Sequence, residues 1–261
     1  MKKGWSFCII TAPGNKKTLL SCIESISSEF CNTGNYEIIV IGGENLGAKF
    51  NEELIRFVDF NEEFFSLRLS NIRRFLKEKS LKRLFLRTGA ICHKKNLAAK
   101  LAKYDKLCVM HDYVSLEKGW RAGFEKFGET WQVSMNVILN KDGSRHRDWM
   151  IWDHPLIKDK NSQACLLPYN EFSRYMYISG TYFCVKKNFF LDNPLDEMLF
   201  WGEAEDVEWS LRVRDKTKFR MNTSSKVKYL KLKSLDDAPY CKSWIDNEKE
   251  LLELIKSGHF F

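Results

Sequence analysis

Short apolar runs alternate with amphipathic segments along the first part of the 261-residue chain. Each run has the length of a buried β-strand and ends in glycine, proline or polar residues. After the first run, Leu19, Ile23 and Ile26 recur at helical spacing. They predict a helix over Lys16–Ser27. The runs that predict strands are Phe7–Thr11, Glu37–Ile41, Ile55–Phe60 and Leu107–Met110. This β-α-β order predicts an α/β fold with a mostly parallel central sheet flanked by helices, and a ligand site at the carboxyl ends of the strands.

The remaining pattern is less regular but predicts further elements. Apolar residues at helical spacing indicate a short helix from Lys94 onward and a longer one within Asn61–Arg87. The other predicted elements are helices over Glu117–Phe127 and around Trp244–Ile255, and strands over Trp131–Leu139, Tyr177–Lys186 and Val227–Leu232. The sequence contains no internal repeat, low-complexity segment or linker, so we expect one domain over 1–261 with two halves.

The chain is basic, with 42 lysines and arginines, 34 aspartates and glutamates, and a formal net charge of +8. This balance favours an anionic partner, such as a nucleic acid, a phosphate-rich small molecule or an anionic membrane surface. The basic residues are spread along the whole chain, which weakens the nucleic-acid interpretation. The eight cysteines form no C-x-x-C pair and several lie in apolar runs. They indicate reduced core residues of a cytosolic protein. No apolar stretch is long enough to span a bilayer.

Carboxylates gather where an apolar run gives way to a helical pattern. The four are Glu203, Glu205, Asp206 and Glu208. Free N–H groups and the helix dipole keep carboxylates ionised at a helix N-terminus, so helix capping on a solvated surface explains the cluster about as well as a functional site does. The neighbouring Trp201 and Trp209 favour the site, since they offer flat apolar walls of the kind that stack on sugars or bases. A carboxylate beside such a wall is a candidate general base.

The strand Leu107–Met110 ends directly in His111-Asp112-Tyr113. Buried charged groups need partners, so a strand that ends in histidine and aspartate indicates a functional role. A histidine at the edge of the core is the alternative. A second charged and aromatic segment runs from Ser144 to Pro155 and holds two histidines and two aspartates, but their spacing matches no strong metal-ligand pattern. We therefore predict no metal site there.

Four motifs occur in a set order along the chain. They are Ile9–Asn15 with the helix after it, Tyr36–Ile41, Lys95–Ala99 leading into Leu107–Tyr113, and Gly180-Thr181 followed by Trp201–Glu208. Together they resemble the GT-A glycosyltransferases, specifically the family 2-like branch, over nearly the whole chain. The counterparts in that family are the opening strand with its turn, the second strand, the helix and strand before the metal-binding D-x-D, and the acceptor-side segment with its E-D base motif.

The resemblance implies a GT-A fold with a smaller acceptor-side sub-region. Residues 1–114 would bind the nucleotide sugar, and residues 115–261 would bind the acceptor and carry the catalytic groups. The reaction would move a sugar from a UDP- or GDP-sugar to a hydroxyl of a glycan, glycolipid or protein, with inversion, Asp206 as general base and Glu205 holding acceptor or donor sugar. The implied donor-binding residues are Thr11, Pro13, Glu44, Lys95, Asn96, His111, Asp112 and Tyr113. The implied acceptor-binding residues are Gly180, Thr181, Trp201 and Gly202.

The chain departs from the family where the family binds its metal. His111-Asp112-Tyr113 stands in place of D-x-D, and the closing strand carries lysines in place of a histidine. We expect Mn²⁺ or Mg²⁺ held by Asp112 and His111. The alternative is a metal-independent enzyme in which Lys231 or Lys233, with Tyr113, stabilises the leaving diphosphate.

Two other classes of function stay open at this point. A non-catalytic GT-A-like protein that binds nucleotide sugars or glycans is one, because the D-x-D motif is altered. A nucleic-acid-binding protein is suggested by charge alone, and the sequence shows no basic stretch with interleaved aromatic residues. We therefore expect no nucleic-acid partner. The basic charge suits a diphosphate donor and peripheral contact with an anionic membrane at its cytoplasmic face.

Overall fold

The computed structural model describes residues 2–31, 33–43, 53–60, 90–152, 164–199 and 204–233. The helices expected within 61–87 and around 244–255 lie outside these ranges. Three of the candidate site residues also lie outside them: Glu44, Trp201 and Gly202.

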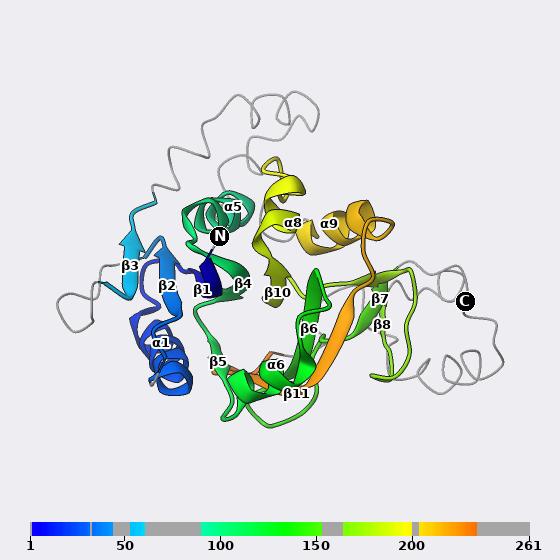
Figure 1. Ribbon diagram of the computed structural model, residues 1–261, viewed down its shortest axis with the longest axis horizontal. Coiled ribbons are helices and arrows are strands. Elements are labelled where there is room, and N and C mark those ends of the chain that lie inside the picture. Colours follow the sequence, from blue (N-terminus) through cyan, green and yellow to red (C-terminus); the bar gives the residue numbers. More distant parts are fainter. Residues whose placement is uncertain are drawn as a thin grey trace.

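Four parallel strands form the first half of the central sheet (Figure 1). β1 (Lys2–Ile10) lies between β2 (Tyr36–Ile41) and β4 (Tyr104–His111), and β3 (Ile55–Val58) is next to β2. Every residue of β2 is buried, which explains why its sequence, apart from Glu37, is apolar and does not alternate between apolar and polar positions. The four predicted strands and their mostly parallel arrangement in one sheet are confirmed.

The second half of the sheet mixes strand directions. Its strands are β10 (Tyr182–Lys186), β6 (Val133–Leu139), β11 (Arg220–Tyr229) and β5 (Val114–Leu116). β10 runs antiparallel to β4 and β6, β11 is parallel to β6, and β5 is antiparallel to β11 at the far edge. The order β3-β2-β1-β4-β10-β6-β11-β5 puts β4 in the middle and β5 at the edge, although only Asp112 and Tyr113 separate them in the chain. The sheet is therefore curled, and these two residues lie where it turns back on itself.

Helices cover the sheet on both sides (Figure 1). Those in the described ranges are α1 (Lys16–Phe30), α5 (Ile91–Leu101), α6 (Trp120–Phe127), α8 (Lys187–Asp192) and α9 (Glu205–Val213). α5 packs against β1 and β2, α6 against β11, and α8 against β4 and β10. The mixed α/β sheet flanked by helices is the predicted fold class. No helix in the described ranges is both long and apolar enough to cross a membrane.

The predicted strand Tyr177–Lys186 is divided between two sheets. Its first residue, Tyr177, belongs to β9 (Met176–Tyr177), which joins β7 (Met150–Trp152) and β8 (Ala164–Leu166) in a small antiparallel sheet, whereas β10 belongs to the large sheet. The N–H of Tyr182 donates to the carbonyl of Ser179 at 3.1 Å, so the chain turns between them. Hydropathy does not reveal this change of sheet, because both pieces are buried.

Aromatic side chains fill the core between the sheet, α1 and α6. They are Trp5, Phe7, Phe30, Trp120, Phe124 and Trp131. Trp120 is fully buried, its ring centroid lies 4.8 Å from that of Trp5, and its indole N–H donates to the Tyr182 hydroxyl at 2.9 Å. Tyr182 in turn donates to the Asn136 amide oxygen at 2.7 Å. This cluster ties α6 to β1, β10 and β6, and so holds together the two halves of the sheet.

Replacement of Trp120 by alanine should lower the free energy of unfolding by about 3–5 kcal/mol, because it removes a fully buried ring and leaves a cavity. Urea unfolding followed by circular dichroism measures the change. The matched control is Arg121→Ala on the next position of α6, which is partly exposed and pairs with Glu125 at 3.2 Å, and which should change stability by no more than about 1 kcal/mol. Equal effects of the two substitutions would contradict the assignment of this core.

Candidate active site

The carboxyl ends of β1, β2 and β4 meet at Thr11 and Asp112. The N–H of Asp112 donates to the carbonyl of Ile10 at 3.2 Å, and the N–H of Thr11 donates to that of Ile41 at 3.1 Å. The Thr11 hydroxyl donates to Asp112 Oδ2 at 2.5 Å. Two of the predicted donor-binding residues, which are 101 positions apart, are therefore in direct contact.

The glycine pair after β2 has a steric cause at this point. Gly42 has a φ of +84°, and a Cβ on it would lie 2.8 Å from the carbonyl oxygen of Thr11 and 2.9 Å from Lys94 Nζ. Only glycine adopts this left-handed backbone at low cost and leaves room for both groups. The two glycines therefore let the chain after β2 pack directly against Thr11 at the end of β1.

Two neighbouring lysines of α5 point into the protein. Lys94 Nζ donates to the Thr11 carbonyl at 2.7 Å. Lys95 Nζ donates to the Gly180 carbonyl at 2.7 Å and to Glu205 Oε1 at 2.9 Å, and its side chain is 1% exposed. Lys94 was not among the predicted site residues, although its position beside Lys95 at the start of an apolar helix could have indicated it. The two lysines link the end of β1 to the acidic helix α9.

The acidic pair Glu205-Asp206 begins α9 and packs on Gly180. Asp206 is half-buried; its Oδ2 accepts the N–H of Gly180 at 2.8 Å, and its Oδ1 accepts the N–H of Val207 at 2.9 Å. A Cβ on Gly180 would lie 2.8 Å from Glu205 Oε1 and 2.9 Å from Asp206 Oδ2. Residue 180 is therefore glycine because the carboxylates come so close to its backbone. Gly180, a predicted acceptor-site residue, contacts both predicted catalytic residues.

The two carboxylates have different electrostatic surroundings. Burial first, and then the charge of Glu205, raise the pKa of Asp206 to about 6, although the Gly180 N–H and Lys95 lower it. Burial is the largest influence on Lys95 and lowers its pKa, but the charge and hydrogen bond of Glu205, together with the charge of Asp206, raise the pKa above its usual value, so Lys95 stays cationic. Glu205 thus has a permanent cation as partner, and Asp206 is able to exchange a proton near neutral pH.

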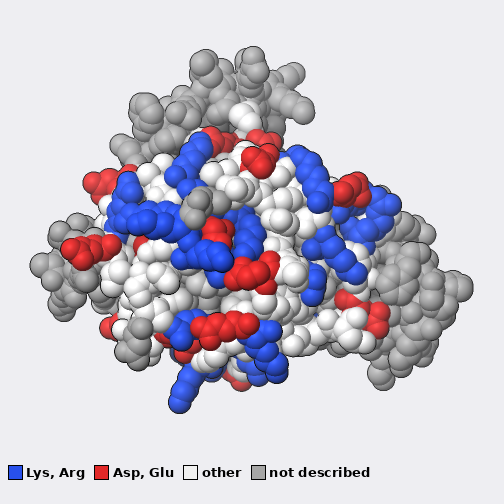
Figure 2. All heavy atoms as spheres, in the orientation of Figure 1, with Lys and Arg blue, Asp and Glu red and all other residues white. Residues whose placement is uncertain are grey.

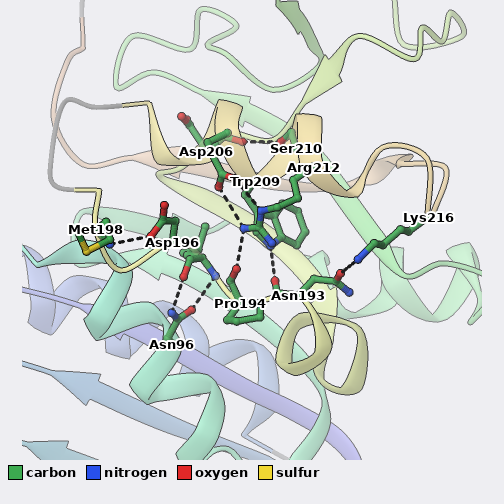
Figure 3. A network of polar contacts seen from close by, with 12 residues as sticks. Asn96, Asn193, Pro194, Asp196, Met198, Asp206, Trp209, Ser210, Arg212 and Lys216 are labelled. Atoms are coloured by element: carbon green, nitrogen blue, oxygen red, sulfur yellow. Dashed lines mark hydrogen bonds and ion pairs between the residues drawn. The ribbon is translucent and has the colours of Figure 1, made fainter. Parts of the chain in front are cut away.

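A polar network fixes α9 against α5 (Figure 3). The Asn96 amide donates to the Leu195 carbonyl at 2.9 Å and accepts the Leu195 N–H at 3.1 Å. The Trp209 indole N–H donates to the Asn193 carbonyl at 2.5 Å, and Lys216 donates to the Asn193 side chain. Asn96 was predicted to bind the donor, and the bonds described for its side chain go to the segment before α9.

The interpretation of Trp209 as a wall for a sugar or base is wrong. Its side chain is fully buried and packs against Phe183, Phe190 and Phe219. Its place on α9 puts it one turn away from Glu205, on the face that is turned toward the core. A helical pattern of apolar residues is the signal that could have assigned it there.

His111, Tyr113 and Thr181 lie together next to Asp112. The N–H of His111 donates to the Thr181 carbonyl at 3.0 Å, and the Tyr113 and Thr181 hydroxyls are 3.5 Å apart. Burial lowers the pKa of His111 well below its usual range, and the charges of four lysines lower it further: Lys95, Lys233, Lys231 and Lys94. The imidazole is therefore neutral. Thr181 follows Gly180 directly. The dipeptide Gly180-Thr181 therefore contacts the triplet His111-Asp112-Tyr113 through Thr181 and the acidic pair Glu205-Asp206 through Gly180.

Lysines after β11 approach the triplet from the other edge of the sheet. Lys231 Nζ lies 3.8 Å from the centroid of the Tyr113 ring, and Lys233 Nζ lies 4.8 Å from it. Burial raises the pKa of Asp112, while hydrogen bonds from Thr11 and Asn15 and the charges of Lys231 and Lys94 lower it. The end of β4 thus carries one carboxylate among several ammonium groups.

The donor set at the triplet fits a divalent cation poorly. Mg²⁺ and Mn²⁺ prefer carboxylate oxygens, and no group of three or more His, Cys, Asp or Glu residues that could hold a metal occurs in the described part of the chain. Asp112 already accepts the Thr11 hydroxyl, and the lysine charges at His111 oppose a cation there. The expected use of Mn²⁺ or Mg²⁺ by Asp112 and His111 stays a prediction, and we derive no catalytic step through a metal.

The charged residues of the 144–152 segment form a structural network. The fully buried Asp148 accepts hydrogen bonds from Arg145 Nε at 2.7 Å, the Tyr169 hydroxyl at 2.6 Å and the Trp149 N–H at 2.7 Å. Burial, with the charges of Arg147 and Lys233, lowers the pKa of His146 to about 3. Asp148 therefore serves to anchor the small sheet.

Pro13, another predicted donor-binding residue, lies exposed in the turn after β1.

Comparison with known proteins shows the fold. No protein-family model and no curated protein sequence matches the chain. It superposes on GalNAc-T7, solved with UDP, GalNAc and Mn²⁺, with a TM-score of 0.57 and 14% identity over 87% of this chain and 44% of that one. It superposes on the 1–349 form of S. aureus TarS with a TM-score of 0.53 and 10% identity over 85% of this chain and 60% of that one. A longer form of TarS gives 0.53 and 12%, with 87% and 36% covered.

The fold is GT-A. GalNAc-T7 and TarS are both GT-A-type glycosyltransferases, so the GT-A fold implied by the resemblance is confirmed. At such low identity the likeness carries the fold and no further property, and the family 2-like branch stays a prediction. This chain spans less than two thirds of the length of these proteins.

Replacement of Lys95 by methionine should lower the free energy of unfolding by about 3–5 kcal/mol, because it leaves the Glu205 carboxylate buried without its cation. The double variant Lys95→Met/Glu205→Gln should recover a large part of that loss, since the uncompensated charge is gone. Urea unfolding at pH 7 measures both. Lys100→Met, at an exposed position of the same helix, is the control and should change stability by no more than about 0.5 kcal/mol. A double variant no more stable than Lys95→Met would contradict a mutual ion pair.

Proposed function

We propose that this protein is a glycosyltransferase that moves a sugar from a nucleoside diphosphate sugar to a hydroxyl acceptor. The observation that carries the proposal is Asp206, a half-buried carboxylate with a pKa of about 6, held by two backbone N–H groups next to the strand ends of a GT-A fold. A base of this pKa is ionised at neutral pH and gains a proton readily. The similarity to GalNAc-T7, which was solved with UDP and GalNAc, supports a nucleotide-sugar donor.

Asp206 acts as the general base in the proposed reaction. Its carboxylate takes the proton of the acceptor hydroxyl while the acceptor oxygen bonds to the anomeric carbon of the donor sugar. The bond from that carbon to the phosphate oxygen breaks, and its electron pair leaves with the nucleoside diphosphate. Attack from the face opposite the leaving group inverts the anomeric centre. Proton transfer of this kind contributes about 10²–10⁴-fold in rate.

The other site residues bind and orient in this proposal. Glu205, paired with Lys95, positions Asp206 and retains a carboxylate oxygen for a sugar hydroxyl. Thr181, which contacts Tyr113, lies between the acidic pair and Asp112 and is suited to the acceptor. Thr11 and Asp112, at the ends of β1 and β4, are suited to the donor, because ligands of open α/β sheets bind at the carboxyl ends of the strands.

The nucleic-acid alternative finds no support on the surface in view. Lysine and arginine side chains on the face in Figure 2 form several groups with acidic side chains among them, and they do not merge into one positive surface. The altered triplet at His111 is the observation that favours a binding protein without catalysis. The placement of Asp206 favours the enzyme.

Asp206→Asn should reduce turnover about 10²–10⁴-fold while the affinity for the donor nucleotide is retained, because the amide keeps the shape and has no basic oxygen. A thermal-shift screen of nucleotide sugars identifies the donor, and release of the nucleoside diphosphate then measures turnover. In the wild-type protein kcat/KM should rise with pH through about 6, because the base has to be ionised.

The matched control is Glu208→Gln, since Glu208 lies in the same turn of α9 but pairs with Arg212 at 2.7 Å. Its turnover should stay close to that of the wild type. An Asp206→Asn enzyme with near wild-type turnover would remove Asp206 as the base. If no nucleotide sugar stabilises the wild-type protein, the proposed function itself is wrong.

A further inference from the structure

Two ammonium groups converge on one tyrosine ring at the end of β4. Lys231 Nζ and Lys233 Nζ lie 3.8 and 4.8 Å from the ring centroid of Tyr113, within the range of cation–π attraction. Lys233 Nζ also lies 5.6 Å from the ring centroid of Tyr229. Both ammonium groups thus lie close to the centroid of the same ring. Because like charges repel, two cations on one ring form an arrangement that an anion stabilises.

The backbone that carries these lysines is fixed from both sides. The N–H of Leu230 donates to the Tyr113 carbonyl at 2.8 Å. Further on, the N–H of Lys233 donates to the buried Asn140 side chain at 3.1 Å, and the Asn140 amide donates back to the Lys233 carbonyl at 3.0 Å. These bonds to two different strand ends hold the backbone of both lysines beside the triplet. Little ordering of the backbone is therefore needed when a ligand binds.

The charge around the triplet is positive. Lys231 is exposed, and it forms no ion pair with the residues that the structure describes. Lys94 and Lys95 approach the same region from α5, where Lys94 bonds to the Thr11 carbonyl and Lys95 bonds to the Gly180 carbonyl and pairs with Glu205. Asp112, within the triplet, is engaged by the Thr11 hydroxyl at 2.5 Å. A divalent cation would add to this charge, whereas a diphosphate would offset it.

We propose that Lys231 and Lys233, seated on Tyr113, form a diphosphate-binding site that does not need a bridging cation. The proposal rests on the proposed function, in which this diphosphate belongs to the donor. When the bond from the anomeric carbon to the phosphate oxygen breaks, the electron pair stays on that oxygen, and the two ammonium groups stabilise the new charge. An ammonium is a compact point charge that binds phosphate well, so no Lewis acid is required at this step.

Inorganic pyrophosphate is the probe, because it tests the anion site without any nucleoside or sugar. Titration calorimetry at low ionic strength, with EDTA present, should show binding to the wild-type protein. Lys231→Met and Lys233→Met should each weaken it about tenfold, and the double variant should weaken it further, since each removes one charge-assisted hydrogen bond. Lys226→Met, which removes the same charge from an exposed position of β11, is the control and should leave binding unchanged.

Three results would overturn the proposal: pyrophosphate binding that requires added Mn²⁺, binding that is the same in the lysine variants and the wild type, and an equal loss in the Lys226→Met control. Because Lys231 is exposed, its variant should keep the wild-type Tm, which separates lost binding from lost folding. Nucleotide-sugar turnover is assayed separately. Lysine-dependent pyrophosphate binding in a protein that binds no nucleotide sugar would refute the proposed function and leave this site in place.

Discussion

The buried ion pair between Lys95 and Glu205 joins three parts of the chain at the candidate site. Lys95 comes from α5, Glu205 from the start of α9, and the Gly180 carbonyl that shares the same ammonium from the crossing between the small and the large sheet. Two charges removed from water are costly unless they are paired and hydrogen-bonded, so the three parts have to keep this arrangement. The same arrangement fixes the position of Asp206, which follows Glu205 in the chain.

Much of the fold could be predicted from the sequence because local patterns determine it. The first strands are buried on both faces and read as continuous apolar runs, and Asp112 at the end of such a run does contact Thr11 at the end of another. The boundary of β10 and the burial of Trp209 could not be read in this way. They depend on which sheet a strand joins and which face of α9 meets the core, and both are decided by residues far away in the chain.

Several residues of the candidate site were named from the sequence, but the contacts between them were not. Lys95, Gly180, Glu205 and Asp206 were all named from the sequence, but the ion pair joins residues 110 positions apart, and a lysine on an amphipathic helix is usually exposed. The same limit applies to Lys231 and Lys233. Their proximity to Tyr113 follows from the curl of the sheet, which brings the edge strand β5 back to β11.

Because burial raises the pKa of Asp206, the folded protein is less stable when Asp206 carries the negative charge that the proposed reaction requires. A carboxyl group whose pKa is higher in the folded than in the unfolded protein favours folding while it is protonated, and that contribution is lost as the pH rises through the folded value of about 6. Below the ordinary aspartate range the contribution is complete. At this one residue, stability and reactivity therefore oppose each other: mildly acidic conditions favour folding with Asp206 protonated and unable to act as a base, and neutral conditions favour the reactive carboxylate at a cost in stability.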